Sequence, residues 1–189
     1  MMKLEDWLKF FKEHSDIKIF HFNHFKMFSN MKSHSLRIAL KRLADKNIIK
    51  RVCRGYYANP FSIPTIEEIS AQIYKPSYVS LESVLSNNGI LSQIPQALTC
   101  VTAKTPRVFD TVFGTIEYRQ IKKTYFWGLY KEGNYLIAEP EKALVDFIYF
   151  RKKKDVERSI SGLDFRSINR KKLKNYAEKM GIELRGHLT

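Results

Sequence analysis

The sequence predicts an α+β fold, and three observations carry that prediction. Short amphipathic helices precede a pair of strand-like segments within residues 1–60. Residues 59–64 then hold Asn59, Pro60 and Pro64, which interrupt the periodic pattern and mark a boundary. After two further helical segments, residues 97–138 alternate like strands, and helical patterns close the chain.

Composition limits the classes of protein that the chain can belong to. Apolar residues make up 44% of the 189 residues and aromatic residues 13%, which is enough for a packed core and argues against disorder. No run of 18 apolar residues occurs, so we expect no transmembrane helix. Cys53 and Cys100 are too few for a disulfide framework or a cysteine-based zinc site. The start of the chain lacks the pattern of a signal peptide, and a cytoplasmic location is expected.

The net charge of +14 is concentrated at the two ends of the chain. Residues 1–60 hold 13 Lys and Arg against 5 Asp and Glu, a net +8, and residues 151–189 hold 12 against 5, a net +7. Residues 61–150 hold 8 against 9, a net −1. Two basic ends indicate a polyanionic partner, either nucleic acid or a membrane surface, although a solvated basic surface gives the same pattern.

The first 30 residues predict two helices and a strand between them. Residues 3–14 carry apolar side chains at helical spacing, and residues 17–20 read as a short strand. Asn23 is placed to cap a helix from residue 24 to about residue 29, with Phe25 and Phe28 facing inward.

Residues 33–45 predict a third helix with an apolar inner stripe and a basic outer face. Ser33 is the expected cap, and Leu36, Leu40 and Leu43 fall on one side at 100° per residue. Asn47 is placed to end the helix in the left-handed conformation.

Residues 46–60 predict a two-stranded ribbon. Residues 48–52 and 56–58 are the arms, and Arg54 and Gly55 form the turn between them, where glycine permits a positive φ. Cations on so short a ribbon either contact phosphates or protect an exposed sheet edge. Helix, strand, helix, turn, helix and ribbon make the order of a winged helix-turn-helix, whose second paired helix enters the DNA major groove. The predicted DNA-binding residues are Ser33, His34, Ser35, Arg37, Ile38, Lys41, Arg42, Lys50, Arg51 and Arg54.

The cationic and the apolar residues of this set suggest distinct roles on DNA. Cations suit phosphates, whereas Ile38 in the middle of the outer face suits the methyl group of a thymine.

The middle of the chain predicts helices, then hairpins, then helices. Thr65 and Glu68 form a capping box, and Ser80 is the expected cap of a helix that ends at Gly89. Strands are expected at residues 98–101, 107–110, 115–121, 125–130 and 135–138. Pro140 begins the next helix, and Glu139, Glu141 and Lys142 are interpreted as residues of its capped first turn.

A last helix is predicted from Asn169 to Met180, ending at Gly181. Cations crowd its first turn, where they oppose the helix dipole, so a functional reason is favoured over local stability. Phosphate contact, contact with an acidic protein and a solvated tail all remain open. The possible secondary basic surface comprises Arg151, Lys152, Lys153, Lys154, Arg170, Lys171, Lys172 and Lys174.

Three stretches between Pro76 and Phe150 carry a family resemblance: PSYVSLESVLSNNGIL, RVFDTVFGTIEYRQIK and FWGLYKEGNYLIAEPEKALVDFIYF. They resemble the AbiEi family of antitoxins, which belong to type IV toxin–antitoxin systems of abortive phage infection. Arg54, Gly55 and Tyr56 are similar to the corner of the family's wing. The resemblance covers about residues 20–155 and is most specific between Tyr78 and Phe150.

The resemblance implies a transcriptional autorepressor that binds inverted repeats near its own promoter and counteracts a nucleotidyltransferase-type toxin. It also implies three regions: residues 1–60 as a winged helix-turn-helix, residues 61–155 as an AbiEi-like antitoxin domain, and residues 156–189 as a basic helical extension. A homodimer on DNA is possible, and neither a cofactor nor an enzymatic activity is expected.

Other functions are open but less favoured. A regulator without a toxin partner has the same DNA-binding residues. RNA binding would use the aromatic residues between Tyr118 and Tyr130 to stack bases. A metal-dependent nuclease would need carboxylates such as Asp110 and Glu117 beside a lysine, but Arg119 stands at that place. His21 and His24 lack further residues at metal-ligand spacing, so no metal site is expected.

Overall fold

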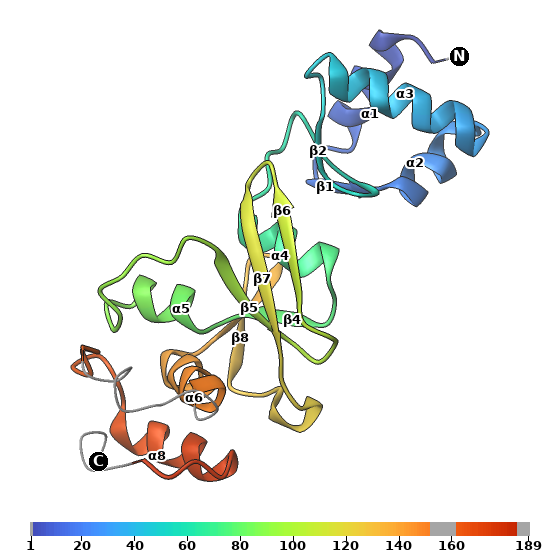
Figure 1. Cartoon of the computed structure of the whole chain (residues 1–189). Coiled ribbons are helices and arrows are strands. Elements are labelled where there is room, and N and C mark those ends of the chain that lie inside the picture. The colour runs from blue at the N-terminus through green and yellow to red at the C-terminus, as the bar shows by residue number, and fades with distance from the viewer. Residues whose placement is uncertain (1, 152–161, 185–189) are drawn as a thin grey trace.

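The computed structural model describes residues 2–151 and 162–184 of the chain. It is a mixed α+β structure with one three-stranded antiparallel sheet and one six-stranded mixed sheet, so the predicted α+β class is confirmed. Figure 1 shows an elongated molecule, with the N-terminal helices at one end and the last helix at the other.

The N-terminal unit packs its helices on one face of the small sheet. Its core holds Trp7, Phe11, Phe25 and three leucines of the third helix, all buried. The strand order is β1-β3-β2, so the last strand lies in the middle. Its elements are α1 (Leu4–Glu13), β1 (Ile19–His21), α2 (Phe22–Ser29), α3 (Ser33–Asp45), β2 (Lys50–Cys53) and β3 (Tyr56–Ala58).

The second unit is built around the six-stranded sheet, whose order is β6-β7-β5-β4-β9-β8. The pairs β4–β9 and β5–β7 are parallel, and the remaining pairs are antiparallel. Its elements are α4 (Ile66–Ile73), β4 (Ser77–Val79), α5 (Glu82–Asn87), β5 (Leu98–Thr102), β6 (Arg107–Thr111), β7 (Gly114–Gln120), η1 (Lys123–Tyr125), β8 (Leu129–Glu132), β9 (Tyr135–Ala138), α6 (Pro140–Arg151) and α8 (Arg170–Lys179).

Helices cover both faces of the six-stranded sheet. Tyr118 donates its hydroxyl proton to the Ser70 carbonyl of α4 at 2.8 Å, so α4 lies on the face that Tyr118 shares. Tyr78 of β4 points to the opposite face of the sheet and donates its hydroxyl proton to Asp146 of α6 at 2.9 Å. Helix α8 then packs on α6 from outside. Because α6 is covered on nearly all sides, even its charged residues from 141 to 148 are buried.

The small sheet is buried on both faces, and this joins the two units. Phe20 and Tyr57 are paired across β1 and β3 and face the N-terminal core. The neighbouring pair, Ile19 and Ala58, belongs to the larger cluster of the second unit, as does Val52. Alternate residues of a strand point to opposite faces, so one thin sheet serves two cores.

Polar contacts reinforce the connection near the boundary predicted at residue 60. The buried Asn59 amide lies within 3.1 Å of the carbonyl oxygens of Phe11, His14 and Ile17, and so ties the end of α1 to β3. Lys18 forms an ion pair with Glu68 of α4 at 2.7 Å. The segment after Asn59 is therefore a short, fixed connection.

Several sequence-based boundaries are confirmed and others are wrong. The capping box of Thr65 and Glu68 is present, and Asn47, Gly55 and Gly89 all have positive φ as expected. Helix α2 instead begins two residues earlier than predicted, because the His21 ring accepts a hydrogen bond from the backbone N–H of Asn23.

Three further expectations fail because tertiary contacts outweigh the local pattern. Ser80 does not cap α5, since its hydroxyl donates to Asp146, and Leu81 precedes the helix with φ 60°. Residues 125–130 are not one strand, because η1 and an irregular turn occupy the first half. Phe28 is 53% exposed rather than buried.

No helix among residues 2–151 and 162–184 combines the length and the apolar character that crossing a lipid bilayer requires.

Candidate nucleic-acid interface

Helix α3 separates a buried apolar side from an exposed polar side. Leu36, Leu40 and Leu43 are 0–6% exposed and fix the orientation of the helix against the N-terminal core. At 100° per residue, the opposite side carries residues 34, 38, 41 and 42. The orientation of the candidate interface therefore follows directly from the burial of these leucines.

Six of the seven α3 residues predicted to bind DNA are exposed, and Ser33 is partly buried at the start of the helix. The helix is not capped by the Ser33 side chain, since Lys32 takes the cap position without a side-chain hydrogen bond. The exposed residues are His34, Ser35, Arg37, Ile38, Lys41 and Arg42.

A shallow hollow of about 430 Å³ runs along one side of this face. Its lining combines the apolar side chains of Met31, Ala39 and Ile38, which is 40% exposed, with the cations Lys32 and Arg42. Apolar side chains beside cations suit a ligand with a small apolar edge and anionic flanks, as DNA presents in the major groove.

Arg37 is held in place by an aromatic neighbour. Its guanidinium lies over the Phe22 ring of α2, 5.5 Å from the ring centroid. Such a contact orders a long side chain while its remaining N–H groups stay available as donors.

The three predicted cations of the ribbon do not form one surface. Lys50 pairs with Ala58 and Arg51 with Tyr57, so the two side chains point to opposite faces of the small sheet. The Lys50 ammonium lies over the Phe113 ring of the second unit at 5.6 Å. The expected cluster of phosphate-binding cations is therefore divided, because strand alternation separates neighbours in the sequence.

Arg54 occupies the exposed turn of the ribbon, next to the start of α2. Gly55 follows it with φ 85°, and its carbonyl oxygen accepts a hydrogen bond from the Phe22 N–H at 2.8 Å. This bond fixes the turn against the N-terminal end of α2, so Arg54 projects from an anchored backbone.

The predicted secondary basic surface is also divided. Lys152, Lys153 and Lys154 lie outside the described residues. Arg151 places its guanidinium 3.9 Å from the centroid of the Phe147 ring. Lys172 is not a free cation, because it pairs with Glu139 at 2.9 Å and approaches Glu141 at 4.0 Å. Exposed cations of the first turns of α8 are Arg170, Lys171 and Lys174.

The ion pair of Lys172 belongs to a polar contact between α6 and α8. Burial raises the pKa of Glu139, but hydrogen bonds from Tyr176 and Lys172 outweigh it and lower that pKa below the ordinary 4.5. The Glu141 carboxylate accepts from the backbone N–H of Asn169 at 2.9 Å. The cation that opposes the α8 dipole is therefore compensated by acids at the start of α6.

The inner side of α6 carries a buried ion pair that the sequence interpretation missed. Lys142 and Asp146 are both 0% exposed and form an ion pair. Tyr78 and Ser80 each donate to the second oxygen of Asp146 at 2.9 Å. Burial lowers the pKa of Lys142 and raises that of Asp146, while each partner partly offsets the shift in the other.

The signal for this ion pair was present in the sequence. A lysine and an aspartate four residues apart face the same side of this helix, and the three residues between them are apolar. The interpretation of Lys142 as part of a helix start hid that pairing.

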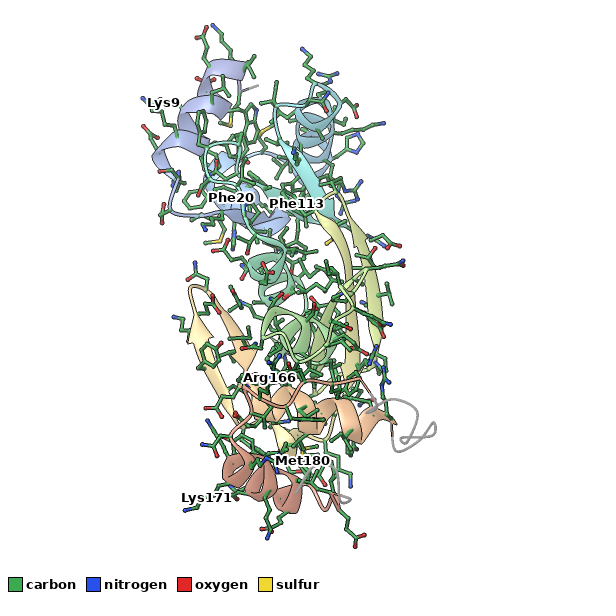
Figure 2. All side chains as sticks on the ribbon, turned by 90° about the vertical axis from the view of Figure 1, so that its left-hand side faces the viewer. Lys9, Phe20, Phe113, Arg166, Lys171 and Met180 are labelled. Atoms are coloured by element: carbon green, nitrogen blue, oxygen red, sulfur yellow. The ribbon has the colours of Figure 1, made fainter. Side chains whose placement is uncertain are left out.

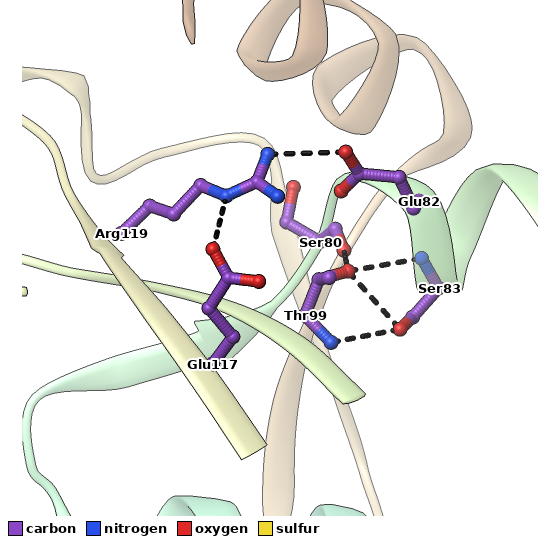
Figure 3. A network of polar contacts seen from close by, with 6 residues as sticks. All are labelled: Ser80, Glu82, Ser83, Thr99, Glu117 and Arg119. Atoms are coloured by element: carbon purple, nitrogen blue, oxygen red, sulfur yellow. Dashed lines mark hydrogen bonds and ion pairs between the residues drawn. The ribbon is translucent and has the colours of Figure 1, made fainter. Parts of the chain in front are cut away.

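Two residues of the nuclease alternative, Glu117 and Arg119, belong to a different network, drawn in Figure 3. Arg119 donates to Glu117 at 2.9 Å and to Glu82 at 3.1 Å, so it bridges two carboxylates. Asp110 lies apart and accepts from the Thr115 hydroxyl at 2.9 Å. Within the described part of the chain, no three His, Cys, Asp or Glu side chains are grouped as metal ligands would be.

Below Arg119, a hydroxyl network fixes the start of α5 to β5. Thr99 donates to the Ser80 carbonyl at 2.7 Å and accepts from the Ser83 backbone N–H at 3.0 Å. These contacts hold Leu81 in its unusual conformation.

The aromatic residues of the RNA alternative are largely used in packing. Tyr118 is 1% exposed, Phe126 stacks edge-on against Tyr78, and Trp127 packs against Tyr176. Tyr130 is 45% exposed. Packing against strands β4 and β6 and against helix α8 therefore accounts for most of this cluster.

A scan against protein-family models finds no match to this chain, and a search of curated proteins finds no similar sequence.

Proposed function

We propose that the chain is a DNA-binding transcriptional repressor of its own promoter, with the N-terminal unit as a winged helix-turn-helix. The element order α1-β1-α2-α3-β2-β3 and the sheet order β1-β3-β2 support this proposal. In this arrangement α3 enters the major groove and the β2–β3 ribbon lies against the sugar-phosphate backbone.

One observation carries the proposal: the exposed side of α3 combines cations with an apolar hollow. Lys41 and Arg42 supply charge for phosphates, and Ile38 supplies an apolar contact in the middle of the face. Ile38 is 40% exposed in the middle of this polar face, and Met31, just before α3, is only partly buried beside it, so apolar surface lies next to the cations.

The experiment measures binding to the DNA upstream of the chain's own gene. Lys41→Ala and Arg54→Ala should each weaken binding and lower the slope of log K against log salt by about one unit. Lys12→Ala on α1 is the matched control, because it removes an exposed cation from the same unit. Unchanged binding by both folded variants would contradict the winged-helix assignment.

We further propose that the chain acts as a type IV antitoxin of the AbiEi kind, without enzymatic activity of its own and in the cytoplasm. The support is the resemblance of the three stretches between Pro76 and Phe150, which contribute β4, α5, the β6–β7 hairpin, the β8–β9 hairpin and α6. The functional partner would be a nucleotidyltransferase-type toxin encoded by the adjacent gene.

Growth rescue tests the antitoxin proposal. The full chain should restore growth when it is produced together with the adjacent gene product. The Lys41→Ala/Arg54→Ala variant should rescue equally well, because the proposed repressor and antitoxin surfaces are separate. Loss of rescue only in this variant would place both activities on the surface formed by α3 and the ribbon, and lack of rescue by the unaltered chain would exclude the antitoxin role.

A further inference from the structure

One end of the six-stranded sheet collects cations that are far apart in the sequence. Thr102 connects three loops there: its hydroxyl donates to the Pro76 carbonyl at 2.8 Å, and its own carbonyl accepts from the Ile121 N–H at 2.9 Å. The backbone N–H of Lys104 donates to the same hydroxyl at 3.2 Å. The cations on these loops, called the sheet-end patch below, are Lys75, Lys104, Arg107, Lys122 and Lys123.

The sheet-end patch lies away from the ribbon. The turn of the β6–β7 hairpin points toward the N-terminal unit, so the start of β6 and the end of β7 lie at the opposite end (Figure 1). In Figure 2, Phe113 marks the hairpin turn beside the small sheet. The patch is therefore a second basic surface and not an extension of the ribbon.

The patch carries positive charge without acidic compensation. All five side chains are exposed, and residues 74–77, 102–109 and 118–126 contain no Asp or Glu. Among the described residues, none of the five forms an ion pair. Repulsion between like charges raises the free energy of the unbound protein, and binding of a polyanion relieves that repulsion.

An aromatic ring holds two of the cations in place. The Lys104 ammonium and the Arg107 guanidinium lie over the Tyr74 ring, 5.4 and 5.6 Å from its centroid. Tyr74 is itself fixed by a hydrogen bond from its hydroxyl to the Thr105 carbonyl at 3.0 Å. Because cations already lie over this ring, it orders charge and is not a free platform for a nucleic-acid base.

The composition of the patch favours phosphates over a protein surface. Protein interfaces are depleted in lysine and contain a packed apolar centre, whereas four of these five exposed cations are lysines. Rows of phosphates are recognised by such cations without reference to base sequence.

We propose that the sheet-end patch binds the phosphate backbone of duplex DNA, independently of sequence, as a second contact besides α3. The choice of duplex DNA rests on the proposed function. The patch would extend the footprint of the chain and add to affinity, while specificity stays with α3.

The test compares two full-length triple variants that lose the same charge. One carries Lys104→Gln, Arg107→Gln and Lys122→Gln, and its matched control carries Lys9→Gln, Lys12→Gln and Lys131→Gln, all exposed. On a duplex of about 40 base pairs, the patch variant should lower the salt slope by about two to three units. The control should change it by less than one unit, and circular dichroism should show both variants folded.

The outcomes separate this inference from the proposed function. Equal slopes for the two variants would show a general charge effect and overturn the inference, as would patch-dependent binding seen with single-stranded RNA but not with duplex DNA. If Lys41→Ala weakens binding while the patch variant behaves as the unaltered chain, the repressor proposal stands and the patch proposal falls. If Lys41→Ala is neutral and the patch variant binds weakly, α3 is not the DNA-reading helix.

Discussion

At the scale of single residues, the protein has an apolar side chain that is exposed on α3 and a pair of charged side chains that is buried on α6. Ile38 is apolar where water is available, and its exposure has no packing benefit. Lys142 and Asp146 are charged where water is excluded, and their cost is offset only by each other and by two hydroxyl donors. The proposed DNA contact accounts for the first, and packing in the fold accounts for the second.

If Ile38 contacts a thymine methyl group, removing either partner should have the same effect. Replacing thymine by uracil at single positions of the upstream DNA should weaken binding about fourfold at one position, as expected for the burial of one methyl group. Ile38→Ala should weaken binding to a similar extent and abolish the sensitivity to uracil. Titration by fluorescence anisotropy measures both effects. Uracil sensitivity that persists in Ile38→Ala would assign the methyl contact to another residue.

The buried ion pair predicts a non-additive response. Asp146→Ala should lower the free energy of unfolding by about 3–5 kcal/mol, because it leaves the Lys142 ammonium buried without a counter-charge. The double variant Lys142→Met/Asp146→Leu should lose less than the single one. Urea unfolding followed by circular dichroism gives both values. A single variant that loses under about 1 kcal/mol would mean that water reaches the Lys142 ammonium.

At the scale of elements, acids at the start of one helix stabilise the next. Helix α8 begins with cations that oppose its dipole, yet Lys172 and Tyr176 both bind Glu139, the residue just before α6. The folded pKa of Glu139 lies below its ordinary 4.5, so this stabilisation is present above pH 4.5 and is lost as the pH falls through the lowered pKa.

Tyr176→Phe should therefore destabilise the protein in a pH-dependent way. At neutral pH the loss should be about 1 kcal/mol, since a partly exposed, charge-assisted hydrogen bond is removed. At pH values where Glu139 is protonated, the difference from the unaltered chain should shrink. Tyr125→Phe is the matched control, because the Tyr125 hydroxyl has no carboxylate partner in the described structure. Thermal unfolding at several pH values tests this, and an equal loss at every pH would contradict it.

At the scale of the whole molecule, the small sheet makes the two units one mechanical body. Its residues alternate between two cores. In addition, the Lys50 ammonium of β2 lies over the ring of Phe113 in the turn of the β6–β7 hairpin. The N-terminal unit, with the proposed DNA-binding side of α3, is therefore connected to the second unit through β2 and β3 rather than through a loose linker.

The two tryptophans allow this connection to be measured. Trp7 lies in the N-terminal core and Trp127 in the second unit. Trp127→Phe and Trp7→Phe variants each leave one fluorescent reporter, and their urea transitions should coincide if the shared sheet joins the units. Val52→Ser, which weakens the face toward the second unit, should separate the two midpoints. Two separate transitions without Val52→Ser would show that the units unfold independently.

Much of the fold follows from local sequence signals. The capping box at Thr65, the left-handed residues Asn47 and Gly55, and the leucine stripe of α3 were predicted because each depends on neighbours within a few positions. The α3 part of the candidate interface was predicted for the same reason, since helical periodicity alone assigns the outer side.

The rest depended on contacts between distant segments, which periodicity does not encode. The sequence by itself determined the α+β class, the order of the N-terminal elements and the outer side of α3. Only the tertiary structure decided that Lys50 and Arg51 face apart, that Ser80 serves Asp146 rather than α5, and that a net −1 segment carries a basic patch. The physical reason is that sheet register and burial bring together, or separate, charges whose spacing along the chain is unrelated to their spacing in the fold.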